Sequence, residues 1–167
     1  MTIGHINVDR LSTPSHYNLL NAKNSTHYYD VIAITETFLT HEQTENHLTL
    51  PDFTLNRHDR QGKSGGGVAL YVRNRWEYKP LAFSIQKNPT IFENKAEYLI
   101  SELKQISQAI LVAVVYRRPK AATPIDLFKD LANLIPKYKI CRFYSRRFYS
   151  PNTSRLQHKI TRNLTLH

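Results

Sequence analysis

Two short, continuous apolar runs constrain the fold of this chain more than any other feature of its sequence. Residues 31–34 read Val-Ile-Ala-Ile between Asp30 and Thr35, and residues 109–116 read AILVAVVY. Apolar runs of this length that are rich in β-branched residues are typical of strands that are buried on both faces. The longer run is also far short of the roughly 20 apolar residues that a membrane helix needs. The sequence therefore predicts sheets that are covered on both sides.

Other segments predict a mixture of further strands and helices. Strands are expected at Ile3–Val8, Phe53–Arg57, Val68–Val72 and Glu97–Lys104. The last of these alternates polar with apolar residues, and the short segment 106–108 favours a hairpin with the run at 109–116. Helices are expected at Pro14–Asn24 and from Thr123, whose hydroxyl can cap the helix, to Pro136. The predicted fold class is therefore α/β.

Charge is distributed unevenly along the chain. The formal net charge is +10, yet all 13 acidic residues lie at or before Asp130. The segment from Leu131 to His167 holds no acid and 8 basic residues, so the first 130 residues contribute only +2. A basic segment that also carries Tyr and Phe attracts polyanions such as nucleic acid. A tail that selection never shaped is the alternative, and the sequence leaves both open.

The regular pattern of apolar residues stops at Tyr138. Residues 139–167 have no clear apolar period and repeat the triplet Phe-Tyr-Ser, so no strand or helix is expected there. The predicted organisation is a partial domain at residues 1–138 and a basic tail at 139–167. The single cysteine, Cys141, excludes an internal disulfide, and no apolar leader is recognised, so an intracellular protein is expected.

Four phrases occur in the order in which one known family has them. They are His5-Ile6-Asn7-Val8, the run from Asp30 through Glu36 to Leu39, the pair Phe53–Arg60 and Gly65–Val72, and Val114–Pro119. Together they resemble the endonuclease domain of non-LTR retrotransposons, in particular that of jockey-like reverse transcriptase polyproteins. This domain is a member of the endonuclease/exonuclease/phosphatase family. The resemblance extends over residues 3–138.

The resemblance implies a two-sheet α/β sandwich of the DNase I-like type, with the site on loops at one edge of the sheets. It implies hydrolysis of phosphodiesters with a divalent metal, usually Mg²⁺, and DNA as the partner. Carried over residue by residue, Glu36 would bind the metal, Asn7 would face the site and Tyr116 would lie near the scissile phosphate. Arg60 would either reach the phosphate or brace the hairpin, and both roles stay open.

The residue types suit these roles, although each also has an ordinary structural explanation. Mg²⁺ prefers oxygen ligands and usually takes one or two carboxylates alongside water and phosphate. Glu36, directly after a buried strand, would be held well for this. Without the resemblance, Glu36 would be interpreted as a helix N-cap acid or as an exposed residue after a strand. Asn7 would be interpreted as a turn residue and Tyr116 as a core aromatic.

The second half of the family's site has no counterpart among these residues. In the family, the helix after the Val114–Pro119 phrase leads into a strand that ends Gly-Asp-Phe-Asn, and an Asp-His motif follows later. Here residues 141–144 read Cys-Arg-Phe-Tyr, and no acid occurs after Asp130. General-base help is worth roughly 10²–10⁴-fold in rate, so little activity is expected. The prediction is an incomplete second half and a remnant of a Mg²⁺-dependent DNA endonuclease that is inactive for lack of these motifs.

Two other functions are compatible with the sequence. One is a non-enzymatic nucleic-acid binder that uses the basic and aromatic residues of the tail for backbone contact and stacking. The other is a phosphoesterase for a small phosphorylated substrate, because the wider family includes such enzymes. The phrase formed by Phe53–Arg60 and Gly65–Val72 favours the retrotransposon branch over this last possibility.

Overall fold

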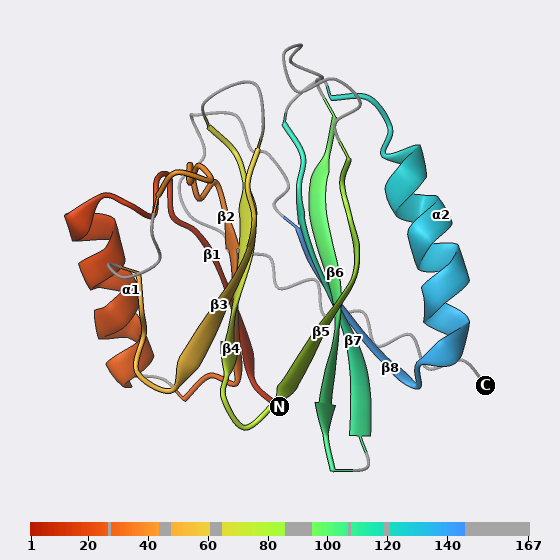
Figure 1. The fold of residues 1–167 in the computed structure, drawn as a ribbon, viewed down its shortest axis with the longest axis horizontal. Helices are drawn as coiled ribbons and strands as arrows, with labels where there is room; N and C mark the ends of the chain where they lie inside the picture. Colours follow the sequence, from red (N-terminus) through yellow and green to blue (C-terminus); the bar gives the residue numbers. More distant parts are fainter. Residues whose placement is uncertain are drawn as a thin grey trace, which may run out of the picture.

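The computed structural model describes residues 1–26, 28–43, 48–60, 65–85, 95–106, 108–118 and 121–145. Within these ranges the chain forms four layers, which are a helix, two facing sheets and a second helix (Figure 1). Each sheet has four strands and mixes parallel with antiparallel pairs. The predicted two-sheet α/β sandwich is confirmed.

The first sheet has the strand order β1-β2-β4-β3. Its strands are β1 (Ile3–Asn7), β2 (Val31–Thr35), β3 (Phe53–His58) and β4 (Val68–Arg73). β1 and β2 run parallel and are connected through α1 (Pro14–Thr26), whereas β4 is antiparallel to both of its neighbours. β2 is buried along its whole length, as the continuous apolar run predicts.

The second sheet has the strand order β5-β6-β7-β8. Its strands are β5 (Glu77–Phe83), β6 (Glu97–Gln105), β7 (Gln108–Tyr116) and β8 (Ile140–Ser145). β6 and β7 form the expected antiparallel hairpin. β7 and β8 run parallel, because α2 (Ile125–Leu134) and the 3₁₀ helix η2 (Ile135–Lys137) return the chain to the starting end of the sheet.

Three apolar clusters hold the four layers together. The cluster between the sheets includes Ala33, Leu70, Leu103, Val112 and Val114. The cluster between the first sheet and α1 includes Leu11, Leu20, Ile32, Ile34 and Tyr71. The cluster between the second sheet and α2 includes Ile100, Leu111, Ala113, Leu127 and Cys141. Successive residues of β2 and β7 thus enter opposite clusters, which explains why neither strand alternates apolar with polar residues.

The sequence does not predict β5. This strand holds Glu77, Lys79 and Pro80, and most of its residues are half-buried or exposed. It lies at an edge of the sheet, and its register to β6 shifts between Pro80 and Ala82. Proline lacks the amide that a central strand needs, so it is tolerated at edges and irregularities of this kind.

The prediction that no strand or helix follows Tyr138 is wrong for residues 140–145. These residues form β8, whose register to β7 runs from Ile110↔Ile140 to Val115↔Ser145. Cys141 is buried against the α2 side of the sheet. Parallel pairing needs only backbone groups, so a strand forms where the apolar period is weak. Residues 146–167 of the predicted tail lie outside the described residues.

The start of α2 also differs from the expectation. Pro124 occupies the position before the first helical residue, and no side chain caps the helix. The backbone oxygen of Thr123 accepts the Ile125 amide at 2.9 Å, so the predicted capping by the Thr123 hydroxyl is wrong. In the part of the chain that the structure describes, neither helix has the length and apolar character needed to cross a bilayer.

A buried carboxylate, Asp30, stabilises the end of the first sheet at which β2 begins and β4 ends. Asp30 is 2% exposed and accepts hydrogen bonds from the Thr2 amide at 2.6 Å and the Trp76 indole at 3.2 Å. It also forms an ion pair with Arg75. Burial alone would raise the pKa of Asp30, but the hydrogen bonds from Thr2, Arg75 and Trp76 outweigh it and lower this pKa.

We expect Asp30→Asn to lower the free energy of unfolding by about 1–3 kcal/mol at pH 7, because buried donors lose an acceptor. The folded-state pKa is lowered, so this stabilisation is present above the usual aspartate pKa and is lost as pH falls through the folded value. Urea unfolding followed by circular dichroism at neutral and acidic pH measures both effects. Asp52→Asn, at an exposed acid, is the matched control. Equal losses in the two variants would contradict the prediction.

Candidate active site

The strand ends of both sheets meet at one end of the sandwich, the upper end in Figure 1. Asn7 is the last residue of β1 and lies opposite Thr35, and Glu36 follows directly. In the second sheet, Glu97 begins β6 and lies opposite Tyr116, the last residue of β7. We call the end defined by Asn7, Glu36, Glu97 and Tyr116 the Glu36 edge. Three of the four predicted site residues are therefore strand-end residues of the same edge.

Glu36 and Tyr116 contact each other across the two sheets. The Tyr116 side chain is buried, and its hydroxyl forms a hydrogen bond with the Glu36 carboxylate. Burial and this hydrogen bond together raise the pKa of Tyr116 to about 12. Tyr116 is therefore protonated at neutral pH, and its hydroxyl donates to the carboxylate.

The backbone around Glu36 is held in an uncommon conformation. Glu36 has φ 59 and Phe38 has φ 56, in the left-handed region that non-glycine residues rarely adopt. The Glu36 carbonyl accepts the Arg10 amide at 2.9 Å, so the loop after β1 fixes the loop after β2. Strained backbone of this kind persists only where the surroundings hold it, and it gathers at functional sites.

Asn7 is oriented by the strand next to it. Its amide nitrogen donates to the Thr35 hydroxyl at 3.3 Å, and that hydroxyl also lies 3.5 Å from His5 Nε2. Thr35 is fully buried. The side-chain oxygen of Asn7 takes no part in this hydrogen bond. Because Asn7 lies opposite Thr35, the residue before Glu36, this oxygen is a candidate neutral ligand for a metal ion at the Glu36 edge.

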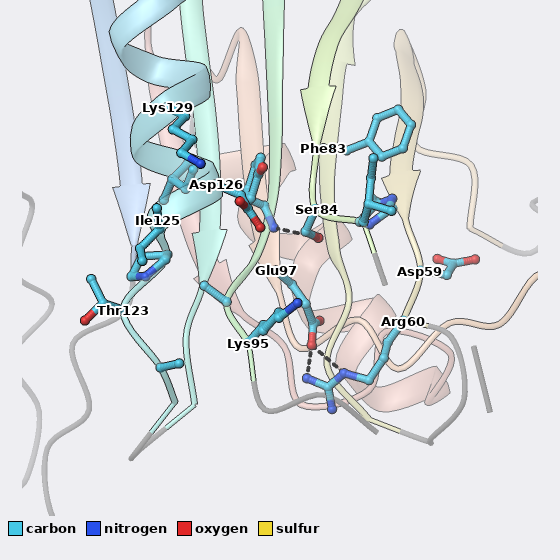
Figure 2. Close-up of a pocket in the computed structure, with 17 residues that line it drawn as sticks. Asp59, Arg60, Phe83, Ser84, Lys95, Glu97, Thr123, Ile125, Asp126 and Lys129 are labelled. Atoms are coloured by element: carbon cyan, nitrogen blue, oxygen red, sulfur yellow. Dashed lines mark hydrogen bonds and ion pairs between the residues drawn. The ribbon is translucent and has the colours of Figure 1, made fainter. Parts of the chain in front are cut away.

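Arg60 forms a buried ion pair with Glu97, drawn as dashed lines in Figure 2. The Gly67 amide also donates to Glu97. Burial raises the pKa of Glu97, and Arg60, the Gly67 amide and Arg118 offset this only in part. The Arg60 guanidinium carbon lies 6.0 Å from the centre of the Tyr116 ring. Arg60 thus contacts β6 and the glycine segment, and a role toward phosphate stays a prediction.

The middle one of three consecutive glycines is explained by this ion pair. Gly65, Gly66 and Gly67 have φ 91, 78 and 83, which glycine adopts without steric cost. A Cβ on Gly66 would overlap the Arg60 guanidinium and the Glu97 carboxylate. The Gly66 carbonyl accepts the Phe38 amide at 2.8 Å, so the same segment also holds the loop that carries Glu36.

Glu97 is the residue of the Glu36 edge that sequence reasoning missed. The available signal was weak, because a glutamate at the start of an alternating strand is ordinarily an exposed residue. Its two partners, Arg60 and the Gly67 amide, both belong to phrases that the resemblance singles out, but only the fold brings β6 beside them. A contact between residues 30 or more positions apart in the sequence leaves no local pattern.

The residues at the Glu36 edge fit Mg²⁺ only as a partial ligand set. Among the described residues, no group of three or more His, Cys, Asp and Glu side chains is placed to hold a metal ion. Mg²⁺ usually takes one or two carboxylates and completes its shell with water and phosphate oxygens. The Glu36 carboxylate and the Asn7 amide oxygen match that minimum, whereas the Glu97 carboxylate is engaged by Arg60 and the Gly67 amide.

Comparison with known proteins supports the fold. No protein-family model and no curated protein matches this chain. Among solved structures, the endonuclease domain of TRAS1, a telomere-specific non-LTR retrotransposon, matches with TM-score 0.55 and 14% identity over 86% of this chain and 58% of that one. D. rerio TDP2 complexed with a single-strand DNA product matches with TM-score 0.55 and 15% identity over 86% and 58%.

A third solved structure belongs to a protein that is named as a member of a family. An endonuclease/exonuclease/phosphatase family protein from Leptotrichia buccalis gives TM-score 0.56 and 15% identity over 82% of this chain and 62% of that one. The chain therefore has the DNase I-like fold of the endonuclease/exonuclease/phosphatase family, and its structural neighbours include a non-LTR retrotransposon endonuclease. It spans somewhat more than half the length of these three structures.

We expect Glu97→Gln to lower the free energy of unfolding by about 3–5 kcal/mol, because it leaves the buried Arg60 charge without its anion. Glu102→Gln, on the same strand, replaces the charged acceptor of one hydrogen bond from Tyr138 by a neutral one and should cost about 1 kcal/mol or less. Urea unfolding of both variants measures the difference. Adding Arg60→Met to Glu97→Gln should recover part of the loss. A Glu97→Gln variant as stable as Glu102→Gln would count against the buried ion pair.

Proposed function

We propose that this chain is a remnant of a Mg²⁺-dependent DNA endonuclease domain that retains half of a phosphodiester site and hydrolyses DNA little or not at all. The observation that supports this best is the hydrogen bond between Glu36 and Tyr116 at the edge where both sheets end. It joins the two residues that the resemblance assigns to the metal and the phosphate. The fold shared with the TRAS1 endonuclease domain and with DNA-bound TDP2 gives further support.

Each retained residue has a role that its surroundings permit. Glu36 would hold the metal ion, and the Asn7 carbonyl oxygen would be its neutral neighbour. Bound Mg²⁺ would polarise a phosphoryl oxygen and offset charge on the leaving oxygen. Tyr116, whose pKa is about 12, keeps its proton and can donate it in a hydrogen bond to Glu36 or to a phosphate oxygen.

The residues that the resemblance expects and this chain lacks are the reason why we propose low activity. β8 follows α2, as the strand that ends Gly-Asp-Phe-Asn follows the helix in the resemblance, and it runs parallel to β7. Here β8 reads ICRFYS and contributes no carboxylate beside Tyr116. Activation of the attacking water by a general base is worth roughly 10²–10⁴-fold, so a site without one should turn over slowly.

Two assays separate hydrolysis from metal binding. Plasmid nicking measures hydrolysis, and Mg²⁺-dependent DNA binding measures whether the metal site is retained. With Mg²⁺ present, we expect the wild-type chain to nick supercoiled plasmid no faster than Glu36→Ala. Mg²⁺-dependent nicking that is lost in this variant would overturn the inactivity that we propose.

Mg²⁺ should nevertheless strengthen binding of a short single-stranded oligonucleotide to the wild-type chain. We expect the increase in affinity on adding Mg²⁺ to be about tenfold smaller for Glu36→Gln than for wild type, because one charge-assisted contact is lost. Fluorescence anisotropy with and without Mg²⁺ measures it. Glu77→Gln, at the exposed start of β5, is the matched control. Equal Mg²⁺ dependence in wild type, Glu36→Gln and Glu77→Gln would remove the support for a retained metal site.

A second candidate is a non-enzymatic nucleic-acid binder, which the acid-free stretch after Asp130 favours. Because β8 is part of the sheet, the test must spare it and delete only residues 146–167, which hold five basic residues. Binding to single strands should then lose roughly 0.7 of the log–log salt slope for every phosphate contact removed. An unchanged slope would show that these residues make no phosphate contacts.

A further inference from the structure

A cavity of about 480 Å³ lies beside the Glu36 edge (Figure 2). Its walls come from the end of β3, the end of β5, the start of β6 and the first turn of α2. Arg60 and Glu97 line it, and the same ion pair supports the loop that carries Glu36. Because Arg60 and Glu97 belong both to the cavity and to the Glu36 edge, one extended molecule can occupy the cavity and the edge together. The volume is within the range of small-ligand sites.

Exposed apolar side chains gather around this cavity. Phe83 is 48%, Ile85 71% and Ile125 59% exposed, and all three line it. They are three of the eight large hydrophobic residues that are exposed in the described part of the chain. Figure 2 shows Phe83 and Ile125 on opposite sides, on β5 and on α2. Apolar side chains concentrated at one concave place mark a binding site more often than scattered ones do.

One wall of the cavity is a pair of flat rings. The Phe83 and His58 rings lie 5.1 Å apart at an angle of 36°. Burial lowers the pKa of His58, although the Ser84 backbone and Asp59 act in the other direction. His58 is therefore neutral at pH 7, and the two rings form an uncharged aromatic surface.

The charged groups of the cavity favour an anionic ligand. Two of its acids already have cationic partners, since Glu97 pairs with Arg60 and Asp59 with Arg57 at 3.3 Å. Lys95 and Lys129 also line the cavity, and Asp126 is the one further acid there. A flat apolar surface with ammonium groups beside it matches a nucleotide, which joins a planar base to a phosphate.

We propose that this cavity receives one base of a single-stranded DNA whose neighbouring phosphate lies at the Glu36 edge. The base stacks on Phe83 between Ile85 and Ile125, and Lys95 and Lys129 attract the phosphate that follows. This inference rests on the proposed function. A peptide fits less well, because its backbone offers no planar ring to stack on Phe83, whereas each nucleotide joins a planar base to a phosphate. A single strand presents an unstacked base, whereas a duplex does not.

Abasic substitution in a fluorescent oligonucleotide tests the proposal on the full chain in Mg²⁺. Removing one base at a time should reveal one position whose loss weakens binding about 5- to 150-fold, the range for one stacked base. Phe83→Ala should weaken binding of the intact oligonucleotide by the same factor. It should not weaken binding further when the oligonucleotide is abasic at the sensitive position. Phe83→Leu, which keeps apolar volume without a ring, should lose most of it. Phe128→Ala is the control, because Phe128 is 56% exposed on α2 and does not line the cavity.

The outcomes distinguish this inference from the proposed function. Sensitivity to both Phe83→Ala and Glu36→Gln, with coupling to one abasic position, supports the base site. Normal binding by Phe83→Ala together with impaired binding by Glu36→Gln overturns the base site and leaves the proposed function standing. Loss in Phe83→Ala with no effect of Glu36→Gln overturns the stated placement beside the metal site, and the proposed function with it. Unfolding curves of each variant exclude a general loss of structure.

Discussion

The buried pair of Arg60 and Glu97 is the interaction on which the Glu36 edge depends. Arg60 follows β3 of the first sheet and Glu97 begins β6 of the second, so the pair bridges the two layers where their strands end. Two buried charges are costly unless they are paired and hydrogen-bonded, and here the Gly67 amide supplies a further bond to Glu97. The pair therefore holds Gly66 and Gly67, which precede β4, against the start of β6.

The consequences reach Glu36 through backbone hydrogen bonds. The glycine segment can pass beneath the ion pair only because Gly66 has no side chain, and its carbonyl then accepts the Phe38 amide. This bond and the one from Arg10 hold Glu36 in a left-handed conformation that an isolated loop would avoid. Tyr116 reaches the carboxylate from β7 in the other sheet. The geometry of Glu36, which we propose as a metal ligand, thus follows in part from the ion pair of Arg60 and Glu97.

The parts of this fold that sequence predicts are those governed by local rules. The runs that form β2 and β7 are apolar throughout because each strand is covered on both faces, and this can be seen without a structure. β5 escapes such reasoning because an edge strand tolerates Pro80 and charged residues. β8 escapes it because its order comes from pairing with β7, as does the role of Glu97, whose partners are distant in sequence.

β8 also shows how this fold can form without the acidic residues that the resemblance expects after this strand. Its register to β7 uses backbone hydrogen bonds, and its place in the core requires only a small apolar residue such as Cys141. Neither requirement depends on acidic side chains after the strand. Carboxylates placed together for catalysis repel one another and are desolvated, so their loss does not destabilise the sheet and can stabilise it. Glu36 differs because the Tyr116 hydroxyl donates to it, and removing it would leave a buried hydroxyl without its acceptor. On the function that we propose, structural constraint alone would preserve Glu36 and Tyr116 without selection for hydrolysis.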